Sequence, residues 1–282
     1  MKKVIFDTGI KRIEFGLDGP YILTNIKTDD FDISVQSENY PDTDGETESE
    51  LLYNSRVVPI KGYIRADEID SLSELRKRLV SVCNGKQSGK LIVMHDDKTY
   101  FSIARPRISP SFGDEIQNYQ EFSLEFKLPE FYWRQIKPDS FIALYKRTDL
   151  IENTFTLPCV FTSRISKNTI HNLGDVPSDM LITVTCVSDT AQTGNVIQIK
   201  NNTTGDVLKI KYDMTVGETI TVNTADCSVS SSIAGDILHK MTVDSDFYKL
   251  PVGESEIEAS SSGGNLNVQL EHYDTFVGVG LC

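Results

Sequence analysis

Short stretches in which apolar and polar residues alternate dominate the first half of the chain, and this pattern is typical of β-strands with one buried face. In residues 121–128 (EFSLEFKL) every second side chain is apolar. Residues 91–103 predict a hairpin that turns at residues 95–98 (HDDK). Residues 57–64 predict another strand, and Pro59 within it indicates an edge strand or a bulge.

One segment has helical spacing instead. Apolar residues recur every three or four positions from Leu72 to Val82, which predicts one face of an α-helix. Ser71 followed by Glu74 predicts a capping box at its start, and Asn84-Gly85 predicts a left-handed stop. We therefore expect an α+β first half with one main helix.

The second half reads as β throughout. Short strands separated by turns that contain glycine are typical of a β-sandwich or jelly roll. The expected strands are residues 179–187, 196–200, 207–212, 219–222, 256–259 and 266–271.

A break in the β pattern divides the chain. Residues 129–149 contain two prolines and a group of aromatic residues that includes the single tryptophan, Trp133. We predict a first domain over residues 1–135 and a second over residues 136–282, with 136–150 as a linker, since 282 residues suit two domains. We expect Phe131, Tyr132 and Trp133 to anchor this linker by area burial and not to stack on a sugar.

Charge excludes one class of function. The chain has 41 Asp+Glu against 28 Lys+Arg, a formal net charge of -13. Proteins that grip a phosphate backbone do so through clustered Lys and Arg, so tight nucleic-acid binding is not expected. The densest basic run, Arg76-Lys77-Arg78, fits the solvated face of the predicted helix. Residues 38–50 (ENYPDTDGETESE) carry many carboxylates and predict a long, solvated loop.

Catalytic and metal-binding motifs are missing from the sequence. The five cysteines include no C-x-x-C pair, and the four histidines fall in no catalytic or metal-binding motif. His95 beside Asp96-Asp97 fits a hairpin turn better than a metal site, because Asp bonds local backbone in turns. Residues 42–46 (DTDGE) lack most ligands of a calcium loop. We expect no enzymatic activity, no cofactor and no metal. No signal peptide and no run of about 18 apolar residues is present, so the chain is expected in solution.

Several motifs, in their order along the chain, point to a known family. The motifs are Gly19-Pro20-Tyr21, residues 56–64 (RVVPIKGYI), residues 71–84, residues 91–103, residues 128–133 (LPEFYW), residues 171–175 (HNLGD), residues 199–205 (IKNNTTG), residues 216–224 (VGETITVNT) and residues 246–254 (DFYKLPVGE). In this order they resemble the distal tail proteins (Dit), the siphovirus-type tail component family of phages that infect Gram-positive bacteria.

The resemblance implies a structural virion protein. It implies a first domain that forms a hexameric ring around the tail channel, and a galectin-like β-sandwich as the second domain. The implied partners are further copies of the chain, the tail-tube protein, the tail-associated tip or fibre protein, and in some tails a receptor-binding protein. The implied location is the virion tail, assembled in the host bacterial cytoplasm.

Two surfaces are expected to serve that assembly. An edge strand offers unpaired backbone groups to a neighbouring copy, and the expected interface residues are Val57, Val58, Ile60, Tyr63 and Ile64. An acidic loop that faces the channel would repel DNA, and its expected members are Asp42, Asp44, Glu46, Glu48 and Glu50.

An alternative function stays open from the sequence. The second domain would be a carbohydrate-binding host-adhesion module of a phage or prophage tail tip, since sandwich folds also serve that purpose. The second half contains no Trp, however, and no cluster of His, Asn and Arg that would mark a glycan site.

Overall fold

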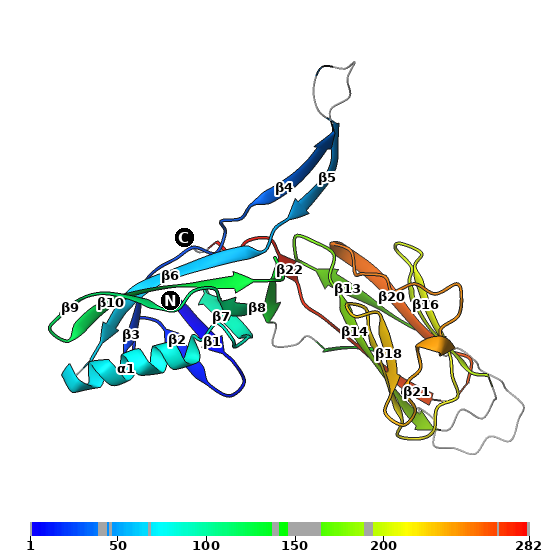
Figure 1. Cartoon of the computed structure of the whole chain (residues 1–282). Helices are drawn as coiled ribbons and strands as arrows, with labels where there is room; N and C mark the ends of the chain where they lie inside the picture. Colours follow the sequence, from blue (N-terminus) through cyan, green and yellow to red (C-terminus); the bar gives the residue numbers. More distant parts are fainter. Residues whose placement is uncertain are drawn as a thin grey trace, which may run out of the picture. The chain divides into compact units, whose positions relative to one another are not determined.

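The computed structural model describes residues 2–38, 44, 47–66, 69–136, 141–145, 165–188, 194–263 and 265–280. The chain divides into two compact units (Figure 1). Unit 1 comprises residues 1–136 with residues 276–282, and unit 2 comprises residues 137–275. The last seven residues, which the sequence prediction gave to the second domain, thus group with the first unit. No helix in the described part of the chain has the length and apolar character needed to cross a membrane.

Unit 1 contains eleven strands and the single α-helix of the described chain. They are β1 (Lys3–Asp7), β2 (Arg12–Phe15), β3 (Tyr21–Ile26), β4 (Ile33–Glu38), β5 (Thr47–Tyr53), β6 (Arg56–Arg65), α1 (Ile69–Val82), β7 (Gly89–His95), β8 (Lys98–Pro106), β9 (Ser111–Ile116), β10 (Tyr119–Leu128) and β11 (Trp133–Ile136).

The main sheet of unit 1 nearly closes on itself. Its strand order is β2-β1-β7-β8-β10-β6-β3, with β9 and β11 added to β10 and β8. The two ends of this path meet where the Gly16 amide donates to Tyr21 O (3.1 Å) and the Leu23 amide donates to Gly16 O (3.0 Å). This near-closure leaves fewer exposed strand edges, and the core of unit 1 includes Trp133 and the α1 side chains Leu72 and Leu79.

Alternation in β10 follows the sequence prediction closely. Its apolar side chains are buried from Phe122 to Leu128, each 2% exposed or less. The predicted hairpin forms from β7 and β8, and Asp96 and Asp97 take positive φ values of 47° and 62° in its two-residue turn.

The ends of the helix differ from the prediction. Helix α1 begins at Ile69, so Ser71 lies in its first turn and the predicted capping-box start is wrong. Past the C-terminal end of α1, the Asn84 side chain accepts the Lys86 amide (3.1 Å), and Gly85 does not have a positive φ. A local side-chain turn therefore replaces the predicted left-handed glycine stop.

Unit 2 is a β structure with two facing sets of strands. They are β12 (Phe141–Tyr145), β13 (Ile165–Asn172), β14 (Met180–Ser188), β15 (Val196–Asn201), β16 (Val207–Lys211), β17 (Thr219–Asn223), β18 (Ser228–Ser231), β19 (Gly235–Asp236), the short 3-10 helix η1 (Leu238–Lys240), β20 (Gly253–Ser261) and β21 (Asn265–His272). Strand β22 (Thr275–Phe276) lies at the division between the units.

The strands of unit 2 form a six-stranded and a four-stranded sheet. Their orders are β12-β21-β14-β17-β18-β19 and β13-β20-β15-β16. Alternate side chains of both sheets form one buried apolar cluster, as in a β-sandwich. The expected mostly β fold, with one main helix in the first half, is confirmed; the galectin-like assignment of unit 2 stays a prediction.

Candidate assembly surfaces

Strands β4 and β5 form a two-stranded ribbon that pairs with no other described strand and extends from the rest of unit 1 (Figure 1). Ile33 lies opposite Tyr53 and Val35 opposite Leu51, so these four side chains share one face. They are exposed by 50%, 45%, 48% and 61% respectively. Exposed apolar faces of this kind mark contact sites on proteins, so this face is a candidate assembly surface.

The same segment is strongly acidic. Residues 28–55 contain nine Asp or Glu and no Lys or Arg. The predicted long loop over residues 38–50 is in part wrong, because Glu48 and Glu50 lie on β5. Asp44 and Glu50 are exposed, whereas Asp42 and Glu46 lie outside the described residues. The channel-facing role of these carboxylates stays a prediction.

Aromatic side chains fix the base of the hairpin to unit 1. Tyr53 stacks on Phe131 with ring centroids 4.4 Å apart and planes 9° apart, and Phe31 meets Phe131 edge-on at 5.1 Å. Tyr132 packs edge-on against both Tyr53 and Phe131. The group from residues 131–133 thus packs within a domain, since Trp133 is fully buried in the unit 1 core.

A buried arginine completes this base. The Arg56 guanidinium is 4.3 Å from the centre of the Phe131 ring, and it donates to the carbonyls of Thr28 (2.9 Å) and Val277. Burial lowers the pKa of Arg56, and the nearby Asp29 carboxylate opposes this shift. Asp29 also accepts the Val279 amide (2.9 Å). Arg56 and Asp29 therefore tie the C-terminal residues to the hairpin base.

The predicted edge strand is wrong. Strand β6 lies inside the sheet, with β10 along its whole length on one side and β3 along Ile60–Ile64 on the other. Pro59 is tolerated because its carbonyl points to the β3 side, where it accepts the Lys27 amide at 3.4 Å. A residue's N–H and C=O point the same way in an antiparallel strand, so the missing N–H of Pro59 would face the very end of β3.

The five predicted interface residues divide into two groups. Val58, Ile60 and Ile64 are 0% exposed in the core, so they cannot contact another copy of the folded chain. Tyr63 is 37% exposed and Val57 is half-buried on the outer face of the sheet. An interface role for these two residues stays a prediction.

No catalytic or metal site is recognisable among the described residues. His95 contacts Asp96 at 3.0 Å (Nε2 to Oδ2) within the β7–β8 turn, as the turn interpretation predicted. No group of three or more His, Cys, Asp or Glu side chains in the described ranges could hold a metal ion.

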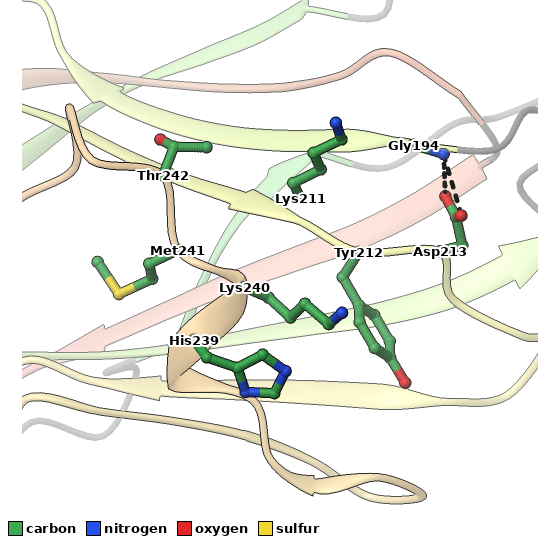
Figure 2. A pocket seen from close by; sticks show the side chains of 8 residues that line it. All are labelled: Gly194, Lys211, Tyr212, Asp213, His239, Lys240, Met241 and Thr242. Carbon is green, nitrogen blue, oxygen red and sulfur yellow. Dashed lines mark hydrogen bonds between the residues drawn. The ribbon is translucent and has the colours of Figure 1, made fainter.

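An open pocket of about 480 Å³ lies between the end of β16 and η1 in unit 2 (Figure 2). Lys211, Tyr212, His239 and Lys240 are among its lining residues. Asp213 also lines it, and backbone hydrogen bonds from Gly194 and Asn195 lower the pKa of this carboxyl group. The two lysines, the histidine and the carboxylate give the pocket a polar lining.

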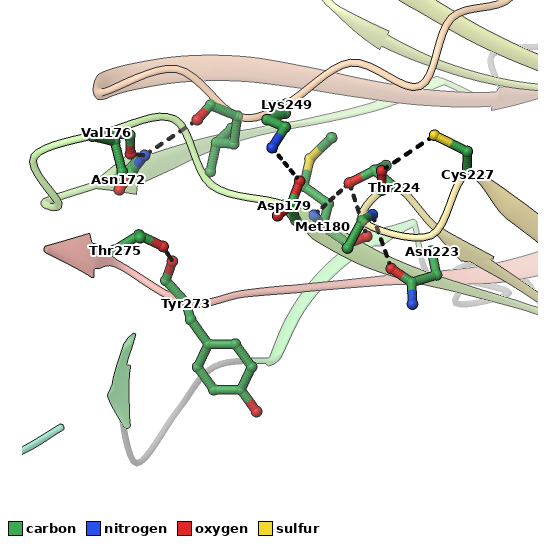
Figure 3. Close-up of polar contacts among 12 residues, drawn as sticks. Asn172, Val176, Asp179, Met180, Asn223, Thr224, Cys227, Lys249, Tyr273 and Thr275 are labelled. Atoms are coloured by element: carbon green, nitrogen blue, oxygen red, sulfur yellow. Dashed lines mark hydrogen bonds and ion pairs between the residues drawn. The ribbon is translucent and has the colours of Figure 1, made fainter. Parts of the chain in front are cut away.

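A tight polar turn opens the sandwich of unit 2 (Figure 3). The Asn172 side chain donates to the carbonyls of Val176 (3.1 Å) and Leu250 (3.2 Å) and accepts the Gly174 amide (3.0 Å). A Cβ atom on Gly174 would lie 2.4 Å from Thr275 O, so no larger residue fits. The motif that supported the family resemblance is therefore a packing requirement.

Two family models match the chain and together cover most of it. The model described as the phage tail protein RIFT-related domain matches residues 9–128, within unit 1. The model described as the siphovirus-type tail component, C-terminal domain, matches residues 173–275, within unit 2. No curated protein matches the sequence.

Solved structures agree with this fold at low sequence identity. The crystal structure of the Dit protein of SPP1, described as a paradigm of the hub adsorption apparatus in phages that infect Gram-positive bacteria, is similar with a TM-score of 0.65 and 12% identity, over 96% of this chain and 99% of that one. A chain of the phage P2 baseplate in its activated conformation with Ca is similar with a TM-score of 0.52 and 10% identity, over 95% and 98%. With both units matched in order, the chain belongs to the siphovirus-type tail component family, the distal tail (Dit) proteins, as the sequence motifs predicted.

Proposed function

We propose that this chain is the distal tail hub of a phage and that its copies form a six-membered ring around the tail channel. One observation carries the proposal of self-assembly: the apolar face of the β4–β5 hairpin is exposed on a ribbon that has no other described strand beside it. A contact in which one copy extends a hairpin onto the next is head-to-tail, and such contacts form a ring when the rotation from copy to copy closes.

The proposed ring joins two kinds of tail protein. On one side it would meet the tail-tube protein, and on the other the tail-associated tip or fibre protein, with a receptor-binding protein as a further partner. Family membership and the similarity to hub and baseplate chains support this role. Assembly in the host cytoplasm and incorporation into the virion tail follow from it.

The proposed role is structural and not catalytic. A ring that passes DNA needs a wall without strong attraction for phosphate, and the net charge of -13 meets that need. The exposed carboxylates Asp44 and Glu50 would add to the repulsion if they face the channel.

Negative-stain imaging of the purified full chain over a range of concentrations tests the proposal. We expect six-fold rings with a central hole. Particles of one-chain size at every concentration, or assemblies of another symmetry without a hole, would contradict the proposed ring.

A further inference from the structure

Two cations face each other on the outer surface of the unit 1 sheet. Arg105 on β8 lies directly opposite Lys127 on β10. The neighbouring residues Pro106 and Phe126 are buried, so Arg105 and Lys127 point to the outside of the sheet. Like charges directly opposite each other destabilise a strand pair, so this arrangement needs another explanation.

No described side chain of the same copy neutralises these cations. The nearest carboxylate on the same face of β10, Glu125, pairs with Arg107 (3.3 Å). Within the described ranges neither Arg105 nor Lys127 makes an ion pair. Val57 lies opposite Lys127 on β6, and Ile108 near Arg105 is 45% exposed. We call these four residues, Arg105, Lys127, Val57 and Ile108, the cationic row.

We propose that the cationic row binds the acidic β4–β5 hairpin of a second copy of this chain. This inference rests on the proposed ring and names the surface that receives the hairpin. Asp29 and Asp30 are engaged within one copy by the Val279 amide and Lys27. Residues 32–50 still contain seven Asp or Glu and no Lys or Arg, which complements Arg105 and Lys127. The hairpin also brings apolar side chains, which suit Val57 and Ile108 better than a nucleic-acid backbone does. In this proposal Val57 is an interface residue, because its side chain lies on the outer face of the sheet.

Charge reversal of the row tests the contact. In the full chain, Arg105→Glu with Lys127→Glu should weaken self-association at least about tenfold, because like charges then meet across the interface. Adding Glu48→Lys and Glu50→Lys to the same chain reverses both surfaces and should restore association. Sedimentation velocity over a concentration series measures each variant.

A matched control has the same change in net charge. Lys77→Glu with Lys98→Glu alters two exposed lysines, on α1 and at the start of β8, and should leave association within about twofold of the original chain, since screening limits the reach of exposed charges outside the row. In addition, Arg105→Gln should raise the urea midpoint of the monomer while it weakens association, because it relieves the repulsion within one copy. If Arg105 only stabilised the fold, its substitution would not raise the urea midpoint and weaken association at the same time.

Three outcomes separate the possibilities. If Val35→Ser with Leu51→Ser abolishes association but the reversal at Arg105 and Lys127 does not, the proposed role of the cationic row is contradicted and the proposed ring is not. If the original chain never associates, both are contradicted. If the reversal leaves association intact but removes binding of a labelled DNA duplex, the row serves DNA and the proposed contact is wrong.

Discussion

Two hairpins of unit 1 carry similar apolar residues, which are buried in one hairpin and exposed in the other. In β7–β8 the inward residues Leu91 and Val93 are 0% exposed. In β4–β5 the corresponding positions Ile33, Val35 and Leu51 are about half exposed. The first hairpin lies inside the main sheet, whereas the second pairs with no other strand in the described part of the chain.

This comparison shows what alternation in a sequence can reveal. The pattern predicts that a strand has an apolar face, but it does not say which chain covers that face. In β7–β8 the cover is the core of the same unit, and in β4–β5 we infer that it is another copy. Mutations in the two hairpins should therefore act on different properties, stability in one and association in the other.

The largest expected effect is on the free energy of unfolding, for a substitution in the buried β7–β8 hairpin. Leu91→Ala should lower the free energy of unfolding by about 2–5 kcal/mol, because it leaves a cavity in a fully packed core. Urea denaturation followed by the fluorescence of the buried Trp133 measures this change. Leu51→Ala is the matched control and should change the unfolding free energy by less than about 0.5 kcal/mol. Equal losses in both variants would remove the distinction between the hairpins.

The next effect concerns the base that holds the exposed hairpin. Arg56→Ala removes hydrogen bonds from a buried cation to Thr28 O and Val277 O, which should cost about 1.5–3 kcal/mol. Hydrogen exchange should become faster for the amides of β4 and of residues 277–280, and the β10 amides should change little. Arg56→Lys keeps the charge and should lose less. Unchanged exchange in Arg56→Ala would show that the aromatic contacts suffice.

A smaller effect is expected for a buried acidic residue of unit 2. Glu218 is buried in unit 2, and although burial raises its pKa, hydrogen bonds from Ser231, Thr215 and Tyr212 lower it overall. A carboxyl with a lowered folded pKa stabilises the fold above its unfolded pKa, and this contribution is lost as pH falls through the folded value. Unit 2 should lose stability as pH falls below the ordinary glutamate value of 4.5.

Glu218→Gln provides the control for this pH dependence. The variant should lose about 1–3 kcal/mol at neutral pH and should depend less on pH below 4.5. Glu50→Gln, an exposed acid on β5, should change neither property. Thermal unfolding at a series of pH values measures both. An unchanged pH slope in Glu218→Gln would contradict the assignment.

Much of the fold could be predicted from strand patterns. The β7–β8 hairpin, β10 and most strands of unit 2 alternate strongly because one face of each packs on a core. Strand β13 cannot be predicted from alternation, since it is largely polar and is held by backbone pairing with β20 along its length. The loop predicted over residues 38–50 overlaps the first part of β5, because acidic residues mask the few apolar positions there, and β4 has no counterpart in the prediction.

The candidate assembly surface could be predicted only in part. Pro59 indicated an edge strand, but nothing local in the sequence shows that β3 ends beside it. The contacts of Arg56 with Phe131 and Val277 join residues far apart in the chain, so no local pattern reveals them. The opposition of Arg105 and Lys127 likewise depends on the register of two strands.

Sedimentation velocity of the Val35→Ser with Leu51→Ser variant tests the central claim most directly. Over a concentration series the original chain should associate, whereas the variant should stay monomeric with an unchanged urea midpoint. Ile116→Ser, at a 69% exposed apolar residue outside the hairpin, should behave like the original chain. If the hairpin variant associates as strongly as the original chain, the apolar face of the β4–β5 hairpin is not the contact between copies, and the proposed assembly through this hairpin is contradicted.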